Sequence, residues 1–128
     1  MLTTALIFVS LAALLHVFIF YMESLAWLKP ATRKTFGITE EQAQQTKEFA
    51  FNQGFYNLFL AITAGVGVAY AAMGNLQLGA ALMIAGAGSM LLAALVLAGG
   101  SPDKRGAAFK QGFAPLVGLA ALAVALLK

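Results

Sequence analysis

The sequence predicts an all-α membrane protein, a bundle of four transmembrane helices forming a single integral-membrane domain over residues 1–128. Three observations support this fold class. Hydrophobic residues make up 61% of the chain and charged residues only 10%, whereas about a quarter of a soluble domain is charged. The apolar residues form four runs, each long enough to cross a bilayer, which takes roughly 20 residues. Lys and Arg are concentrated in two patches between these runs, and basic loops of this kind determine the orientation of membrane proteins.

The first span is expected over residues 3–28, with no charged residue before Glu23. A cleaved signal peptide is the alternative, but no Lys or Arg precedes this run and the run is longer than the apolar core of such a peptide. Lys29-Pro30 should end the helix, because proline disfavours helical geometry in the residue before it.

A polar segment of mixed charge, residues 29–48, follows and contains the helix breaker Gly37. Thr39-Glu40-Glu41-Gln42 matches a capping box, with Thr39 as the N-cap and Gln42 at the third helical position. We therefore expect a helix to begin near residue 40 and to run directly into the second span, residues 49–73. Gly54 is the expected position of a bend.

The short turn Gly74-Asn75 separates the second span from the third, residues 76–99. Small residues suited to close helix contact recur on both spans: Ala61, Ala64, Gly65, Gly67 and Ala71 on the second, and Gly79, Ala80, Ala81, Gly86 and Gly88 on the third. Ser89 can bond to its own backbone. A second charged loop, residues 99–106, leads to the fourth span, residues 107–127, where Pro115 would be tolerated within the first turns.

The distribution of basic residues predicts the orientation. Four of the eight Lys and Arg lie in residues 29–48 and three in residues 104–110, whereas the turn at 74–75 has none. By the positive-inside rule, both charged loops are cytoplasmic and both termini lie outside the cytoplasm.

A short internal repeat suggests that the chain consists of two related helical hairpins. Phe51-Asn52-Gln53-Gly54-Phe55 and Phe109-Lys110-Gln111-Gly112-Phe113 share the pattern F-x-Q-G-F, and each follows a basic loop. A chance match in a chain rich in Gly and Phe is the alternative. The halves are not equivalent, because the first carries most of the intramembrane polar residues.

Those polar residues form the candidate site. His16 and Glu23 lie two turns apart on one helix face, with about 10 Å of rise between them. Asn52 with Tyr56, and Gln53 with Asn57, are pairs at i and i+4 on the second span. The complete candidate set for ligand binding or proton coupling is His16, Glu23, Trp27, Asn52, Gln53, Tyr56, Asn57 and Gln111.

Antiparallel spans would place Glu23, Asn52, Gln53 and Gln111 near the cytoplasmic edge of the membrane. Tyr56 and Asn57 would then lie deeper, and His16 near the midplane. Hydrocarbon cannot satisfy polar groups, so these side chains need partners. A carboxylate facing the bundle would be bonded to Asn52, Gln53 or Tyr56.

Each candidate also has a purely structural interpretation. Glu23 could extend to the interface near Lys29, and His16 could bond between helices. Trp27 could anchor the chain at the interface. The amides Asn52, Gln53 and Asn57 could simply hold helices together. An ionisable residue inside a membrane is nevertheless a candidate for function by default.

The residue types that are missing exclude several chemistries. With one His and no Cys, the chain has no disulfide and no ordinary metal site within one copy. No phosphate loop and no set of nucleophile, base and acid is present. The sequence predicts no cofactor, no metal and no nucleic-acid partner.

The pattern H-x6-E-x3-W (His16, Glu23, Trp27), followed by N-Q-G-x-Y-N from Asn52 to Asn57, resembles domain-of-unknown-function family 1304. The likeness extends to the start of the last helix at Gln111, Gly112 and Pro115. It implies a four-span protein of the bacterial inner membrane. It implies no activity.

Three functions remain open. The first is binding or transport of a small molecule through a polar site near the cytoplasmic side, which would require a homodimer because four spans enclose little space. The second is an accessory protein whose polar residues only hold the helices together. The third is an enzyme acting on a lipid or isoprenoid with His16 and Glu23 as acid and base, and an enzyme is the less favoured class. Membrane lipids are expected partners in every case.

Overall fold

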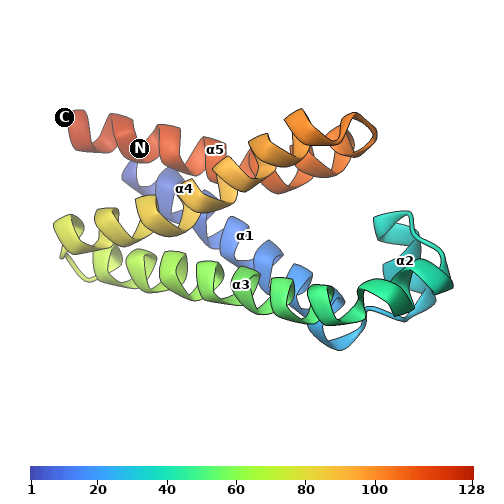
Figure 1. The fold of residues 1–128 in the computed structure, drawn as a ribbon. Coiled ribbons are helices and arrows are strands. Elements are labelled where there is room, and N and C mark those ends of the chain that lie inside the picture. The colour runs from blue at the N-terminus through green and yellow to red at the C-terminus, as the bar shows by residue number, and fades with distance from the viewer. The chain divides into compact units, whose positions relative to one another are not determined.

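A computed structural model describes all 128 residues and contains helices but no strands. The helices are α1 (Leu2–Phe20), continued by a π-helical turn at Tyr21–Leu25, then α2 (Pro30–Phe36), α3 (Glu40–Ala72) and α4 (Leu76–Gly100); a 3-10 turn at Pro102–Lys104 leads to α5 (Arg105–Leu127). Figure 1 traces this order along the chain. Four helical segments are long and apolar enough to cross a membrane. The predicted fold class is confirmed.

The contacts divide the chain into two compact units. One comprises Met1–Leu15 and Leu60–Lys128, and we call it the bundle unit; the other, residues 16–59, we call the crossing unit. The divisions fall within α1 and within α3, so each of these helices contributes to both units.

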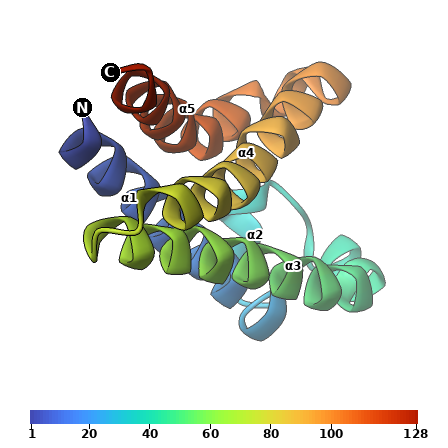
Figure 2. The same ribbon diagram turned by 90° about the vertical axis from the view of Figure 1, so that its left-hand side faces the viewer.

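Small side chains and methionines form the core of the bundle unit, with contributions from all four long helices. The buried members are Ala5, Val9, Ala12, Ala64, Ala71, Ala80, Met83, Ala87, Met90, Ala121 and Leu122. Alanine lets helix backbones approach closely, which is how helices associate where lipid removes most of the hydrophobic driving force. Figure 2 shows α4 passing from its turn with α3 to its connection with α5.

Glycines set the contact between α3 and α4. A Cβ at Gly79 would lie 2.5 Å from the Ala71 nitrogen, and one at Gly86 would lie 2.7 Å from the Ala64 nitrogen. Neither distance is possible without moving a backbone. The small-residue surface predicted for these two spans is confirmed at these positions. Gly65 and Gly88, which were predicted to belong to it, face open space instead.

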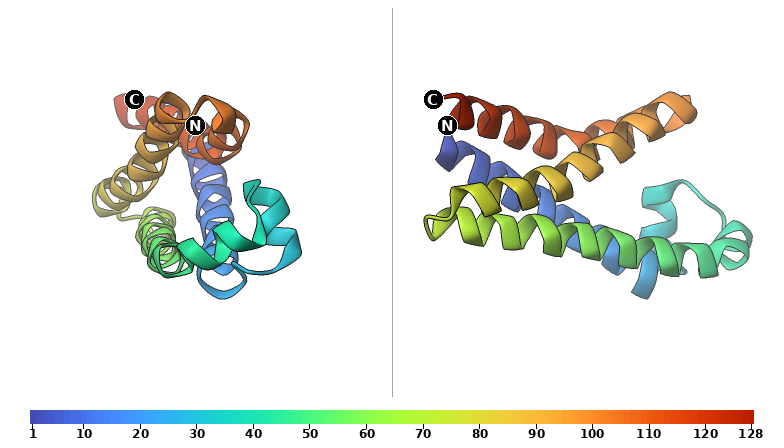
Figure 3. Two further views of the ribbon diagram at one scale, coloured as in Figure 1. Left: turned by 45° about the vertical axis from the view of Figure 1, so that its right-hand side comes forward. Right: turned by 60° about the vertical axis from the view of Figure 1, so that its left-hand side comes forward.

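The turn between α3 and α4 is as tight as the sequence indicates. Gly74 adopts a φ of 97°, a conformation that favours glycine. The Asn75 side chain caps α4 by accepting a hydrogen bond from the Leu78 nitrogen at 3.1 Å. Both chain termini lie at the same end of the bundle unit as this turn, and the α4–α5 connection lies at the other end (Figure 3).

The first span ends earlier than the predicted residue 28. Its last turn is π-helical and is closed by a hydrogen bond from the Ala26 nitrogen to the Tyr21 oxygen at 2.9 Å. Pro30 does not mark the end of this helix but the beginning of α2. The fixed φ of proline suits a first helical residue, where its missing N–H is not needed. Gly37 then ends α2 with a φ of 67°.

The fourth span also begins before the predicted residue 107. Since α5 starts at Arg105, Pro115 lies inside the helix and not in its first turns. Proline cannot donate to the carbonyl four residues earlier, so the Gln111 oxygen has no helical partner there. Pro115 is fully buried, which indicates that its ring is accommodated by packing.

Candidate functional site

The end of the first span crosses α3 at Ser24 and Gly54. The Ser24 Oγ donates a hydrogen bond to the Phe51 oxygen at 2.7 Å. A Cβ at Gly54 would meet the Ser24 Oγ and would lie 2.9 Å from the Ser24 nitrogen. The rings of Phe20 and Phe55 pack edge to face beside the crossing, with centroids 5.0 Å apart. The helix α3 continues through Gly54, and this glycine allows the close approach of Ser24. The bend expected at Gly54 stays a prediction.

The π-helical turn places Glu23 at this crossing. Such turns insert one extra residue into a helix, and they are frequent at functional sites. Glu23 is 9% exposed. Its Oε1 accepts a hydrogen bond from Asn57 Nδ2 at 2.6 Å, and the same Nδ2 donates to the Gln53 oxygen at 3.2 Å.

The second carboxylate oxygen of Glu23 is available to a ligand. Asn57 provides the side-chain hydrogen bond to this carboxylate, and no Lys, Arg or His forms an ion pair with it. No fully enclosed side-chain nitrogen or oxygen lacks a partner, so the second oxygen is reached from outside. The expected donors were Asn52, Gln53 or Tyr56. The structure corrects this to Asn57, which lies one helical turn beyond Gln53.

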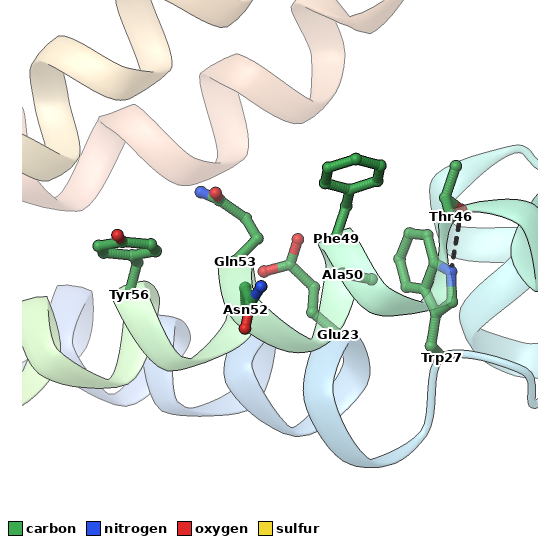
Figure 4. A pocket seen from close by; sticks show the side chains of 8 residues that line it. All are labelled: Glu23, Trp27, Thr46, Phe49, Ala50, Asn52, Gln53 and Tyr56. Carbon is green, nitrogen blue, oxygen red and sulfur yellow. Dashed lines mark hydrogen bonds between the residues drawn. The ribbon is translucent and has the colours of Figure 1, made fainter.

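An open pocket of about 430 Å³ adjoins the carboxylate. It is lined by Glu23, Trp27, Thr46, Phe49, Ala50, Asn52, Gln53 and Tyr56. In Figure 4 the Glu23 carboxylate, the Gln53 amide and the Phe49 ring extend to the same side of the helices. The lining therefore combines one acid, two amides and three aromatic rings.

Trp27 is held at one end of this pocket by two hydrogen bonds and a ring contact. Its Nε1 donates to the Ala43 oxygen at 3.1 Å and to Thr46 Oγ1 at 3.2 Å. Its ring packs against Phe36 at a centroid distance of 4.9 Å. Trp27 therefore ties the segment after the first span to both α2 and α3.

Three polar residues of the lining have side chains without a hydrogen-bond partner in the chain. Asn52, Gln53 and Tyr56 are exposed, and their side chains make no hydrogen bond within the chain. Sequence reasoning missed Ser24, Thr46 and Phe49. Thr46 and Phe49 lie one turn before Ala50 and Gln53 on α3, so helical periodicity from Asn52 and Gln53 could have found them.

Two predicted residues lie apart from this lining. His16 is buried on α1 and belongs to the crossing unit, but it does not line the pocket. This geometry offers no support for His16 and Glu23 acting on one substrate. Gln111 is half-buried on α5 in the bundle unit, and its part in the site stays a prediction. No group of three or more His, Cys, Asp or Glu is placed to hold a metal ion.

These features define a small all-α protein with four apolar helices of membrane-spanning length and a carboxylate at the end of the first. The chain belongs to the family described as a protein of unknown function (DUF1304), whose model matches residues 10–123. The matched range includes every candidate site residue. No curated protein and no solved structure shows significant similarity to the chain.

Proposed function

We propose that this protein is a multi-pass protein of the bacterial inner membrane. It binds a small molecule at the Glu23 pocket, and this binding is a step in the transport of that molecule. The observation that carries the proposal is the buried Glu23 carboxylate, which has one amide donor and one oxygen facing an open pocket. Ionisable groups within membrane spans are rare, and they mark pathways for substrates, ions or protons.

The composition of the lining supports a binding role over a purely structural one. Amides that only hold helices together should be bonded between helices. Asn57 fits that description, since it bonds to Glu23. Asn52 and Gln53 do not, because they are exposed at the pocket.

The distribution of charge supports a cytoplasmic opening. Lys29, Arg33 and Lys34 follow the first span, 6 to 11 residues after Glu23, and the positive-inside rule assigns such segments to the cytoplasm. Both termini then lie on the opposite side. Transport would require two copies of the chain, since four helices surrounded by lipid enclose no wide pathway.

The proposal is tested by comparing Glu23→Gln with Glu48→Gln in purified protein. Glu48 is an exposed carboxylate on α3 that does not line the pocket. We expect compounds that raise the melting temperature of the parent and of Glu48→Gln to lose that effect with Glu23→Gln. A broad screen in which no compound stabilises the parent, or in which Glu23→Gln responds like the parent, would overturn the proposal.

A role as an accessory protein is the second candidate, and the Glu23–Asn57 hydrogen bond favours it because it joins two spans. The same variant separates the two roles. Glutamine at position 23 keeps an oxygen that can accept from Asn57, so a structural role predicts retained stability and retained function in cells. A binding role predicts retained stability with lost function.

A further inference from the structure

We propose that the ligand of the Glu23 pocket is an organic cation, an ammonium group carried on an apolar body. This inference rests on the proposed function and specifies the class of molecule bound. Three features of the crossing unit support it: the charge of the lining, its aromatic rings, and the positions of the chain's own cations.

The lining contains one acid and no base. Glu23 is the only charged residue among the eight that form the pocket wall. Its bonded partner, Asn57, is a neutral amide. A buried carboxylate without a cation is costly when ionised, and a bound cation removes that cost. An anionic ligand would meet repulsion from Glu23 and no compensating charge.

Three aromatic side chains line the same pocket as this acid: Trp27, Phe49 and Tyr56. Phe49 is 77% exposed and Tyr56 is 66% exposed, so their ring faces are not used in packing within the chain. The electron-rich faces of aromatic rings attract ammonium groups, and Trp does so most strongly. Trp27 is already fixed by its bonds to Ala43 and Thr46, so it loses little freedom on binding.

The two lysines that lie near Trp27, Lys29 and Lys47, are not part of this pocket wall. The Lys29 Nζ lies 3.4 Å from the Tyr21 hydroxyl and 5.9 Å from the centre of that ring. Lys29 and Lys47 line a separate pocket, whose wall also includes Trp27. No lysine therefore occupies the place of a ligand cation beside Glu23.

The size and polarity of the pocket define the ligand further. A volume of about 430 Å³ falls within the range of roughly 300–1,000 Å³ typical of small-molecule sites. The exposed amides of Asn52 and Gln53 can accept N–H bonds from a primary or secondary ammonium. The ammonium group could belong to a free molecule or to the headgroup of an ethanolamine lipid, and the experiment below distinguishes the two.

The experiment uses Trp27 as its own reporter, because it is the only tryptophan in the chain. Purified full-length protein is titrated with benzyltrimethylammonium, with its uncharged carbon analogue neopentylbenzene, and with benzylsulfonate. We expect a saturable change in tryptophan fluorescence with the cation alone. Glu23→Gln should weaken that binding by about tenfold or more, and Glu48→Gln should leave it unchanged.

A second pair of variants keeps the test valid if Glu23→Gln fails to fold. Phe49→Leu removes an exposed ring from the lining, whereas Phe59→Leu removes an exposed ring from the same helix outside it. Only Phe49→Leu should weaken binding of the cation. Equal binding of the cation and neopentylbenzene, or preferential binding of benzylsulfonate, would overturn the inference while leaving a ligand site in place.

A different result would overturn the proposed function itself. In that case none of the three probes would change the tryptophan fluorescence, either in detergent or in lipid. For the lipid arm, the protein is placed in nanodiscs of phosphatidylglycerol with increasing phosphatidylethanolamine. Competition by the ethanolamine lipid against benzyltrimethylammonium would identify the headgroup as the source of the ammonium. An affinity independent of the lipid would identify a free molecule.

Discussion

At Gly54 the absence of one methyl group determines how closely the first span can approach α3. An added Cβ would lie 2.9 Å from the Ser24 nitrogen and 3.0 Å from the Ser24 Cβ. The backbone of one helix must therefore shift to admit it. We expect Gly54→Ala to destabilise the protein by about 1–3 kcal/mol, measured as thermal unfolding in detergent by circular dichroism.

Gly65→Ala is the matched control on the same helix. Its added Cβ would meet nothing within 4 Å, so alanine should be neutral or stabilising by at most about 1 kcal/mol through its higher helix propensity. Similar unfolding temperatures for the two variants would show that the crossing at Ser24 is not tight.

The hydrogen bond between Glu23 and Asn57 should appear as an energetic coupling. In a double-mutant cycle with Glu23→Leu and Asn57→Leu, we expect a coupling of about 0.5–2 kcal/mol. Each single substitution leaves the other polar group without its partner at the crossing. Unfolding of the four proteins in detergent measures the coupling, and a value within error of zero would contradict the bond.

The residue types of the site could be predicted from the sequence, but their partners could not. Polar groups in an apolar run demand partners, and this singles out Glu23 and the amides near Gly54. The amide that bonds to Glu23 is decided by how the two helices are rotated and how deep each one lies. The two bonded residues are 34 positions apart in the sequence, so no local pattern contains this information. The role of Ser24 could not be predicted for the same reason, because it depends on a contact with Gly54 on another helix.

At the scale of the helix, the N-terminus of α3 is fixed by a capping box read directly from the sequence. The Gln42 nitrogen donates to Thr39 Oγ1 at 3.1 Å, and the Thr39 nitrogen donates to Gln42 Oε1 at 2.9 Å. Thr39→Ala removes the first of these bonds and should cost about 1 kcal/mol. Faster amide hydrogen exchange in the first turns of α3 would report this loss.

Thr35→Ala is the control for that measurement. Thr35 is exposed, and its Oγ1 bonds to the Ala31 oxygen inside α2, so its removal frees no helix terminus. Exchange in α3 should stay at the parent rate. Equal exchange in the parent and in Thr39→Ala would mean that the capping box does not stabilise α3.

Local signals of this kind explain which elements the sequence predicts. The four apolar runs, the capping box and the turn at Gly74 depend on neighbouring residues, and all were predicted. The π-helical turn at Tyr21–Leu25 was not, because no residue pattern distinguishes it from an α-helical turn. The helix α2 was also missed, since Pro30 signals both the end of one helix and the beginning of another.

At the scale of the whole molecule, the two F-x-Q-G-F segments occupy comparable positions in the two units. Within the crossing unit Gly54 meets Ser24 of the preceding span, and within the bundle unit Gly112 meets Ala94 of its preceding span, with an added Cβ 3.0 Å from the Ala94 Cβ. Each motif therefore provides a glycine for close contact with the helix before it. At the position that corresponds to Asn57, the second half has Pro115, so a polar site is built only in the first.

The orientation of the whole chain gives the last prediction. Since the protein contains no cysteine, single cysteines report their side of the membrane without background. Met73, beside the α3–α4 turn, is 73% exposed, and Thr35 and Asp103 are exposed in the two basic loops. If both loops are cytoplasmic, as the positive-inside rule predicts, a membrane-impermeant maleimide should label M73C in intact cells. It should label T35C and D103C only after the cells are permeabilised.

Labelling of T35C and D103C in intact cells would show that the chain has the opposite orientation. Labelling of only one of the two would separate the basic loops across the membrane and contradict the parallel-hairpin arrangement that the repeat predicts.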